Sequence, residues 1–339
     1  MSLKPIDPYD DPRVTHEFAT LNGRNYHYVQ GLPQGTLKGT IFCIHGFPDF
    51  WYGWKNIIPY LLQKGFRVVV PDMIGYGKTD MPRVPPSPIS AYSWKSTASD
   101  MYALTQHLKL SNVILLGHDW GAFVSYRIHL YHPRRFTHII TVCGFFIPIM
   151  PVFFPLEVMV QKYPSFTYQI AFSDPQTDKD LESEDNRRKF IKFLYRNSKD
   201  AKPVGKLQVE KDLISGIGED NTLSALFTEK DLEVYMDAFS RGFHGPLNWY
   251  KIREVNHEDE QKLEITRIEV PTLIIRAMKD MAIRPEMIDS QDKLITDLTV
   301  RDVEASHWAL LEAPEEIFKH IDEWLGNVVL GSKLKLELN

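Results

Sequence analysis

The ten residues from Asn112 to Gly121, NVILLGHDWG, decide the fold expected for this chain. A run of strand-type apolar residues ends abruptly at Gly117-His118-Asp119-Trp120-Gly121, and the next residues, AFVSYRIHLYH, have helical spacing. Glycines two residues before and two residues after Asp119 allow strand and helix backbones to approach closely. The stretch therefore predicts a strand, a strained turn that pushes Asp119 into a cleft, and a helix.

A carboxylate at the tip of such a turn indicates a nucleophile, and a carboxylate nucleophile restricts the kind of carbon atom that can be attacked. Attack by Asp119 on a carbonyl carbon would give a mixed anhydride, whereas attack on a saturated carbon that bears a leaving group gives an ester. Epoxide carbons and halogen-bearing carbons meet this requirement. The alternative is that Asp119 only caps the following helix, a common position for Asp.

The other apolar segments alternate between strand and helix types. A β-hairpin is expected first, and further strands and helices follow along the chain: hairpin strands 16–21 and 25–31, strands 40–46, 66–73, 136–144, 271–280 and 298–308, and helices near 51–63, 100–108 and 314–324. Strands that alternate with helices predict a mostly parallel sheet with helices on both faces.

The alternation is interrupted after Gly144. Residues 145–262 read as helical and polar, and strand-helix alternation returns only near Val270. We therefore expect residues 1–144 and 263–339 to form one α/β core and residues 145–262 to be an inserted α-helical cap. Ligands of open α/β sheets bind beyond the carboxyl ends of the strands, so this cap would roof the site.

Composition excludes several classes of function. The 339 residues carry a net charge of -5 with mixed signs throughout, which gives no basic face for nucleic acid. The N-terminus has no apolar signal-peptide region, and Cys43 and Cys143 lie in apolar strand-like runs, where small buried side chains are expected rather than a disulfide. A cytoplasmic location is the expectation.

One apolar stretch, 139–160, imitates a membrane span. Pro148, Pro151 and Pro155 would each break a helix there, so no membrane span is expected. The stretch instead predicts an apolar lining or lid, and hence a hydrophobic and fairly large substrate.

A nucleophile needs a base and a group that orients the base. The order nucleophile, acid, histidine is met by Asp119, by Asp280 at the end of one predicted strand, and by His307 after the next. Asp289 and Asp302 are rivals for the acid, but neither lies at the carboxyl end of a strand.

The turn His45-Gly46-Phe47-Pro48 ends the strand expected beside the Asp119 strand. Backbone N–H groups of Phe47 and Trp120 would then form an oxyanion hole. The alternative is an ordinary Gly-Pro turn.

Together, His-Gly-Phe-Pro, Gly-His-Asp-Trp-Gly, the Asp280 and His307 positions and the inserted cap resemble the soluble epoxide hydrolases of the α/β-hydrolase superfamily, from about residue 16 to residue 326. In that family two cap tyrosines hold the epoxide oxygen, one in a Phe-x-Tyr-Gln segment and one in Asn-Trp-Tyr. Phe166-Thr167-Tyr168-Gln169 and Asn248-Trp249-Tyr250 match these motifs, so the resemblance implies those roles for Tyr168 and Tyr250. Asp49 stands where related enzymes often carry Glu.

The resemblance implies an α/β-hydrolase fold and hydrolysis of an epoxide to a vicinal diol through an Asp119 ester, with Asp280-oriented His307 activating water. Its partners would be a small hydrophobic epoxide and water, with no metal or cofactor, and Phe47, Trp120 and Trp308 would contact the substrate. One alternative is a haloalkane or haloacid dehalogenase, which shares the Asp nucleophile, and another is a non-catalytic binding protein. Natural substrate, selectivity, a role in detoxification or biosynthesis, and monomer or homodimer remain open.

Overall fold

The computed structural model describes residues 3–200, 213–217, 222–263 and 267–330. Its centre is an eight-stranded sheet in the order β1-β2-β4-β3-β5-β6-β7-β8. The strands are β1 (Thr15–Leu21), β2 (Arg24–Gly31), β3 (Gly39–Ile44), β4 (Phe66–Pro71), β5 (Val113–His118), β6 (Phe136–Val142), β7 (Thr272–Ala277) and β8 (Leu298–Val303). Among the described strands, the two pairs that involve β2 are antiparallel and the other five pairs are parallel, so the predicted, mostly parallel sheet is confirmed.

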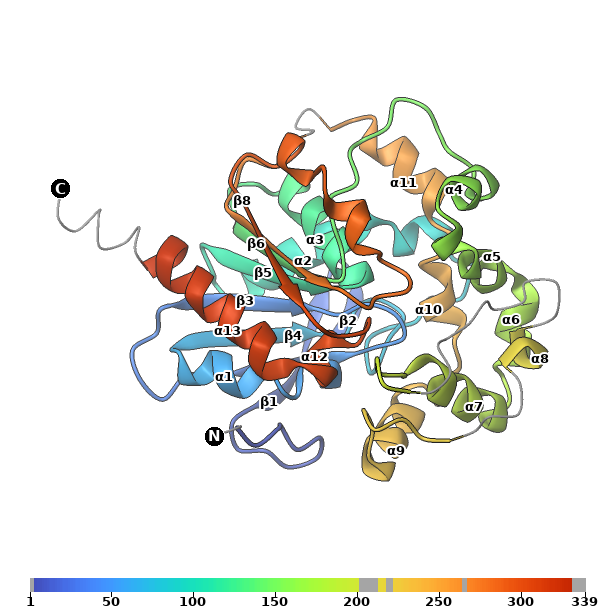
Figure 1. The fold of residues 1–339 in the computed structure, drawn as a ribbon, viewed down its shortest axis with the longest axis horizontal. Helices are drawn as coiled ribbons and strands as arrows, with labels where there is room; N and C mark the ends of the chain where they lie inside the picture. The colour runs from blue at the N-terminus through green and yellow to red at the C-terminus, as the bar shows by residue number, and fades with distance from the viewer. Residues whose placement is uncertain (1–2, 201–212, 218–221, 264–266, 331–339) are drawn as a thin grey trace.

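The central strands are hydrophobic along their whole length because both faces of the sheet are covered. Every residue of β5 is buried, as are nearly all residues of β3 and β4. Figure 1 shows the covering helices, with α1 (Ile58–Gln63) and α13 (Pro314–Trp324) on one face and α2 (Trp94–His107) and α3 (Trp120–Tyr131) on the other. Cys43 and Cys143 are free thiols buried in this core, as expected.

The N-terminal hairpin closes through a two-residue turn. Leu21 pairs with Arg24, and the turn residues Asn22 and Gly23 both have positive φ, 48° and 83°. Asn-Gly suits this conformation because both residues tolerate positive φ and the resulting turn follows the twist of the strands. The predicted hairpin is confirmed.

The helix expected over residues 51–63 is divided in the structure. A short 3₁₀ helix covers Trp51–Trp54, and α1 begins only at Ile58. Pro59 in the first turn of α1 lacks an N–H, which suits the start of a helix rather than its interior. The helix expected near 100–108 begins earlier than predicted, at Trp94. The Ser93 side chain caps this N-terminus by accepting a hydrogen bond from the N–H of Ser96 at 3.2 Å.

Between β6 and β7 the described residues form helices and no strand of the sheet. These helices are α4 (Leu156–Lys162), α5 (Tyr168–Ser173), α6 (Pro175–Asp180), α7 (Glu184–Leu194), α8 (Leu213–Ile217), α9 (Glu229–Ala238), α10 (His244–Asn248) and α11 (Arg253–Glu260). They gather at one end of the sheet in Figure 1. We call residues 145–262 the cap segment, and its limits as a domain remain a prediction. Among the described residues, no helix is both long and apolar enough for a membrane crossing.

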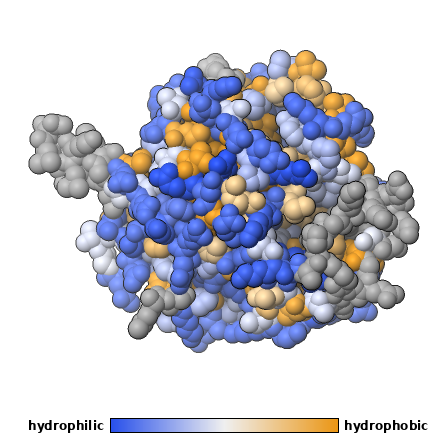
Figure 2. All heavy atoms as spheres, viewed as in Figure 1, coloured by the Kyte–Doolittle hydropathy of each residue, from blue (hydrophilic) through white to orange (hydrophobic). Residues whose placement is uncertain are grey.

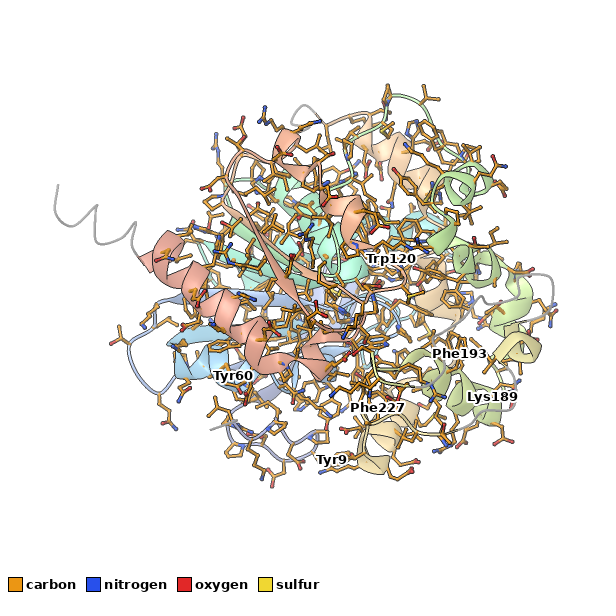
Figure 3. All side chains as sticks on the ribbon, in the orientation of Figure 1. Tyr9, Tyr60, Trp120, Lys189, Phe193 and Phe227 are labelled. Atoms are coloured by element: carbon orange, nitrogen blue, oxygen red, sulfur yellow. The ribbon has the colours of Figure 1, made fainter. Side chains whose placement is uncertain are left out.

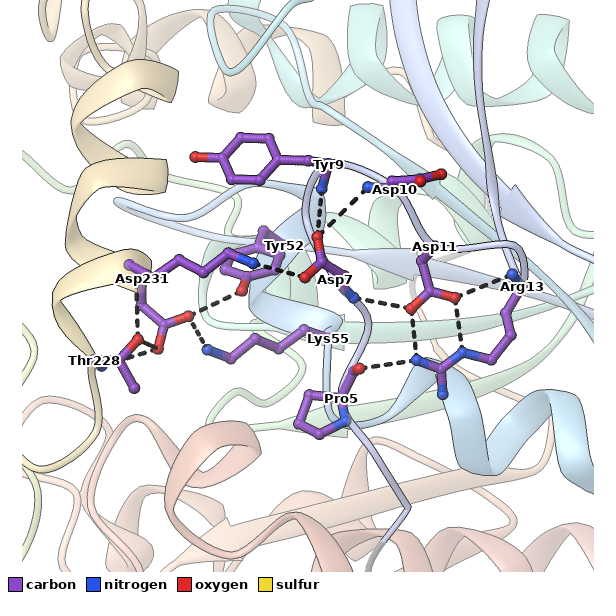
Figure 4. A network of polar contacts seen from close by, with 11 residues as sticks. Pro5, Asp7, Tyr9, Asp10, Asp11, Arg13, Tyr52, Lys55, Thr228 and Asp231 are labelled. Atoms are coloured by element: carbon purple, nitrogen blue, oxygen red, sulfur yellow. Dashed lines mark hydrogen bonds and ion pairs between the residues drawn. The ribbon is translucent and has the colours of Figure 1, made fainter.

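A polar network fastens the cap segment to the core (Figure 4). Asp231, in the first turn of α9, accepts hydrogen bonds from the Tyr52 hydroxyl at 2.9 Å and from the Lys55 ammonium group. The carboxylate also completes a capping box with Thr228. The side chains of Lys55 and Asp231 are only 10% and 8% exposed. Two buried opposite charges therefore join α9 to the segment that follows β3.

Replacement of Asp231 by Ala is expected to lower the free energy of unfolding by about 3–5 kcal/mol, because the buried Lys55 ammonium loses its carboxylate. Urea unfolding followed by circular dichroism measures this loss. Asp7→Asn is the matched control, because it removes the more exposed ion pair between Asp7 and Lys230 in the same network. If both substitutions lowered the free energy of unfolding by the same small amount, the buried Lys55–Asp231 pair would not stabilise the fold as expected.

Candidate active site

Asp119 lies at a sharp turn between β5 and α3, with φ 53° and ψ -125°. A Cβ atom on Gly121 would lie 1.9 Å from the carbonyl oxygen of Ile44, and one on Gly117 would lie 2.3 Å from the carbonyl oxygen of Gly121. No side chain fits at either position, so strand and helix meet only because both residues are glycine. The strained turn expected from the sequence is confirmed, and its positive φ is sustained by this packing.

The Asp119 carboxyl group is buried, with 7% of the residue exposed. Its Oδ1 accepts a hydrogen bond from the Phe47 backbone N–H at 2.8 Å. Burial raises the pKa of Asp119, although the charge of His307 and the N–H groups of Phe47 and Trp120 act in the opposite direction. The two backbone groups expected at an oxyanion hole therefore both face the Asp119 carboxyl group.

His307 follows β8 and lies between two carboxylates. Its Nδ1 is 2.8 Å from Oδ2 of Asp280, and its Nε2 is 3.5 Å from Oδ2 of Asp119. The other Asp280 oxygen accepts from the backbone N–H groups of Ala282 and Ile283 at 2.8 and 3.0 Å. Asp280 is thereby fixed, and it orients the ring whose far nitrogen faces Asp119.

The charges of Asp119, His307 and Asp280 each favour the charged form of the neighbouring group. Burial alone would lower the pKa of His307, but the charge and hydrogen bond of Asp280 and the charge of Asp119 raise it to about 9. Burial alone would raise the pKa of Asp280, but His307 and the two backbone N–H groups bring it below its usual value. The ligand-free site thus favours an imidazolium between two carboxylates.

The rival acids lie elsewhere. Both Asp289 and Asp302 form ion pairs with Arg276, at 2.9 and 2.6 Å, and their side chains are 63% and 47% exposed. Neither residue lies directly after the carboxyl end of a strand, because Asp302 is inside β8 and Asp289 comes well after the end of β7. Of the three candidates, Asp280 is the one hydrogen-bonded to His307.

Tyr168 and Tyr250 come from different parts of the cap segment and meet there. Their ring centroids are 6.2 Å apart, and the Tyr250 ring lies 5.3 Å from Trp120 and 5.0 Å from Phe47. Burial, with a contribution from the Asp119 charge, raises the pKa of both phenols. Both hydroxyls therefore keep their protons at neutral pH and are suitable donors.

The site contains a cavity of about 150 Å³ between the α/β core and the cap segment. Asp119, Trp120 and Tyr168 line it, and Figure 3 shows Trp120 between the sheet and the cap helices. Its other walls are largely apolar and include Trp94, Phe123, Ile147, Phe153, Met159, Trp249, Ile252 and Ile283. The apolar stretch near residue 150 does contribute lining, as predicted.

The cavity is bordered by apolar side chains that also reach the surface. Figure 2 shows the viewed face as mainly hydrophilic with separate hydrophobic patches. Met150, Val152 and Phe154 are both exposed and part of the cavity lining. In the same wall Arg127 and Glu260 form a buried ion pair at 2.8 Å, which no sequence motif indicated.

Trp308 does not line this cavity. Its indole N–H donates to the carbonyl oxygen of Leu194 at 2.7 Å, and its ring stacks on Tyr195. Its ring also contacts the rings of His307 and His118, with centroids 5.1 and 5.9 Å apart. Direct contact of Trp308 with substrate stays a prediction. Leu194 and Tyr195 have no motif in the sequence, so their place beside the site was missed.

Among the described residues, one group has donor atoms close enough for a metal ion. It consists of His118, Cys143 and His307, whose donor atoms lie within 4.8 Å of one another. The ring of His118 donates through Nε2 to the carbonyl oxygen of His307 at 2.8 Å, and the Cys143 thiol reaches the same oxygen at 3.3 Å. Hydrogen bonds to the His307 backbone thus account for both side chains. The expectation that no metal is required stays a prediction.

Comparisons with known proteins identify the family and the fold of this chain. Residues 39–314 match the family model described as the alpha/beta hydrolase fold. The chain is 32% identical to an epoxide hydrolase of Neurospora crassa, srdG, over 96% of this chain and 99% of that protein. It is also 32% identical to the rat bifunctional epoxide hydrolase 2, of which it spans 56%. A solved structure of a mutant epoxide hydrolase from Vigna radiata superposes with a TM-score of 0.80 at 26% identity, covering 93% of this chain and 99% of that one.

Proposed function

This chain belongs to the epoxide hydrolases of the alpha/beta hydrolase fold, and we propose that it converts an epoxide to a vicinal diol through a covalent ester on Asp119. The observation that carries the mechanism is the row Asp119–His307–Asp280, with contacts of 3.5 and 2.8 Å, beside two protonated phenols. The apolar cavity suits a hydrophobic epoxide as substrate.

In the first half-reaction a carboxylate oxygen of Asp119 attacks one ring carbon, and the bond from that carbon to the ring oxygen breaks. The ring oxygen would leave as an alkoxide unless it received a proton. Tyr168 and Tyr250 hydrogen-bond this oxygen, and one of them supplies the proton. The product is a hydroxyalkyl ester of Asp119.

In the second half-reaction His307 takes a proton from water, and the resulting hydroxide attacks the carbonyl carbon of the Asp119 ester. Backbone N–H groups of Phe47 and Trp120 stabilise the oxyanion. Collapse of this intermediate restores the Asp119 carboxylate and releases the diol. One proton of the water restores the tyrosine hydroxyl that gave up its proton in the first half-reaction. The other proton completes the second hydroxyl group of the diol.

Ester formation itself prepares the base. The negative charge of Asp119 is one cause of the raised pKa of His307, and esterification removes that charge. The imidazolium therefore loses part of its stabilisation once the ester has formed. A neutral His307 then becomes available when water must be activated.

The double substitution Tyr168→Phe and Tyr250→Phe is expected to lower the rate of ester formation by about 10²–10⁴-fold, because the leaving oxygen loses its proton donors. Rapid quenching and mass spectrometry of the intact protein measure this rate. Each single substitution should have a smaller effect, since one phenol remains. Tyr163→Phe is the control, because Tyr163 is another tyrosine of the cap segment and has no proposed role. An unchanged rate in the double variant would remove the phenols from the mechanism.

The test of the function is an assay of diol formation from racemic aryl and alkyl epoxides, with a haloalkane panel beside it. Diol from epoxides and little halide release is the expected outcome, because the two phenols suit an oxygen leaving group. Halide release at a comparable rate would favour the dehalogenase alternative. A pure binding protein would form neither product.

A further inference from the structure

One short part of the cap segment, residues 194–198, contacts both loops that carry the second half-reaction. Leu194 is the last residue of α7, and residues 195–198 follow it directly. One of the two loops contains His307, and the other contains Phe47, whose N–H faces Asp119. Because the two loops are far apart in sequence, the spacing between base and oxyanion donor depends on what lies between them.

Tyr195 is the residue that reaches both loops. Its ring stacks on Trp308, the residue after His307, with centroids 3.8 Å apart and planes at 19°. Its hydroxyl donates to the carbonyl oxygen of Pro48, the residue after Phe47, at 2.8 Å. Tyr195 is 1% exposed, so both contacts are shielded from water.

Further hydrogen bonds hold the His307 loop against residues 194–198. The indole N–H of Trp308 donates to the carbonyl oxygen of Leu194 at 2.7 Å, and the Ser306 hydroxyl donates to that of Arg196 at 3.2 Å. The Glu312 carboxylate accepts from the backbone N–H groups of Ser306, at 2.8 Å, and of Ser198, at 3.2 Å. Both sequence neighbours of His307 are thus tied to the cap segment.

We propose that Tyr195 is a positioning residue for hydrolysis of the Asp119 ester, a role that rests on the proposed function. It holds the loop of the base and the loop of the oxyanion donor at one separation. Water attack needs both groups placed around the same ester carbon, and small displacements of such groups are costly. Alkylation depends instead on Asp119, whose backbone is fixed by its own turn, and on Tyr168 and Tyr250. Of these groups only the Asp119 carboxyl is hydrogen-bonded to the Phe47 loop, so alkylation is less sensitive to Tyr195 than hydrolysis is.

The experiment compares Tyr195→Phe, which keeps the ring and loses the hydroxyl, with Tyr195→Leu, which loses both contacts. Tyr126→Phe is the matched control, because it removes a buried hydroxyl that contacts Thr141 at 3.2 Å, away from both loops. With styrene oxide as probe, rapid quenching and mass spectrometry of the intact protein give the rate of ester formation and the fraction of enzyme held as ester. Thermal melts are recorded for every variant.

For Tyr195→Phe we expect ester hydrolysis to slow by about tenfold while ester formation stays within about twofold, so that more enzyme is held as ester. Tyr195→Leu should slow hydrolysis further, and Tyr126→Phe should leave the ratio of the two rates as in the wild type. Glu312→Gln, which weakens the other tie to the His307 loop, should raise the ester fraction in the same direction and provides a second variant if Tyr195→Leu does not fold.

Equal slowing of both half-reactions together with a lower melting temperature would overturn the inference, because that is the signature of a purely structural residue. An unchanged hydrolysis rate in Tyr195→Phe would also overturn it while leaving the proposed function in place. A wild-type protein that forms diol without any ester would instead overturn the proposed mechanism, and the inference with it.

Discussion

Asp119→Asn is expected to lower diol formation by about 10⁴-fold or more, because loss of a covalent nucleophile removes the whole reaction route rather than one stabilising contact. An amide oxygen is a poor nucleophile, and the Asn side chain keeps the size of the carboxyl group in a turn where backbone and side chain are closely packed. The measurement is the rate of diol formation from the epoxide that the wild type converts fastest.

This loss should not come from unfolding. Burial raises the pKa of Asp119, so the ionised carboxylate costs folding free energy that a neutral side chain does not. The melting temperature of Asp119→Asn is therefore expected to equal or exceed that of the wild type. A clearly lower melting temperature would mean that the carboxylate stabilises the turn, and the activity loss would then need another explanation.

The ester route makes an isotopic prediction for the same residue. In a single turnover in ¹⁸O-labelled water, the label should enter Asp119, because water attacks the carbonyl carbon and the diol keeps an oxygen from the original carboxylate. Peptide mapping of the segment that contains Asp119 locates the label. Label found in the first diol instead would exclude the covalent route and favour direct attack of water on the epoxide.

His307→Gln is expected to trap the enzyme as its ester. Alkylation needs no base, whereas hydrolysis loses its general base and should slow by about 10²–10⁴-fold. Intact-protein mass spectrometry should show nearly stoichiometric addition of one epoxide mass, with diol released only slowly. Combining the substitution with Asp119→Asn is the control, because the adduct must then disappear. Continued rapid diol release without an adduct would exclude His307 as the base.

The pH dependence of wild-type ester hydrolysis follows from the same charges. Only neutral His307 accepts a proton from water, so the rate should fall as the pH is lowered through the pKa that His307 has in the ester. Asp280 is the largest cause that raises this pKa. Asp280→Asn should therefore move the acidic limb of the profile to lower pH while also reducing the maximal rate. A limb that stays in place would show that another group titrates.

Local sequence predicted most of the fold and the sharp turn that carries Asp119, the proposed nucleophile. Glycines at 117 and 121 around Asp119 fixed the turn, because only glycine tolerates the backbone contacts found there. Asp280 and His307 were predictable because the carboxyl ends of parallel strands meet at one edge of the sheet. The division of the helix expected over 51–63 was the main local error, although Pro59 was a visible signal for it.

Only the tertiary structure decided which parts of the cap segment meet the core. Tyr195, Glu312 and the Arg127–Glu260 pair carry no motif, and each acquires its place through a partner distant in sequence. A period of hydrophobic residues specifies which face of an element is buried, but it does not specify what that face packs against. The sequence by itself therefore determined the turn at Asp119, the order of Asp119, Asp280 and His307 along the chain, and the reaction class. Long-range packing decided which residues form the cavity walls and which residues contact the His307 loop.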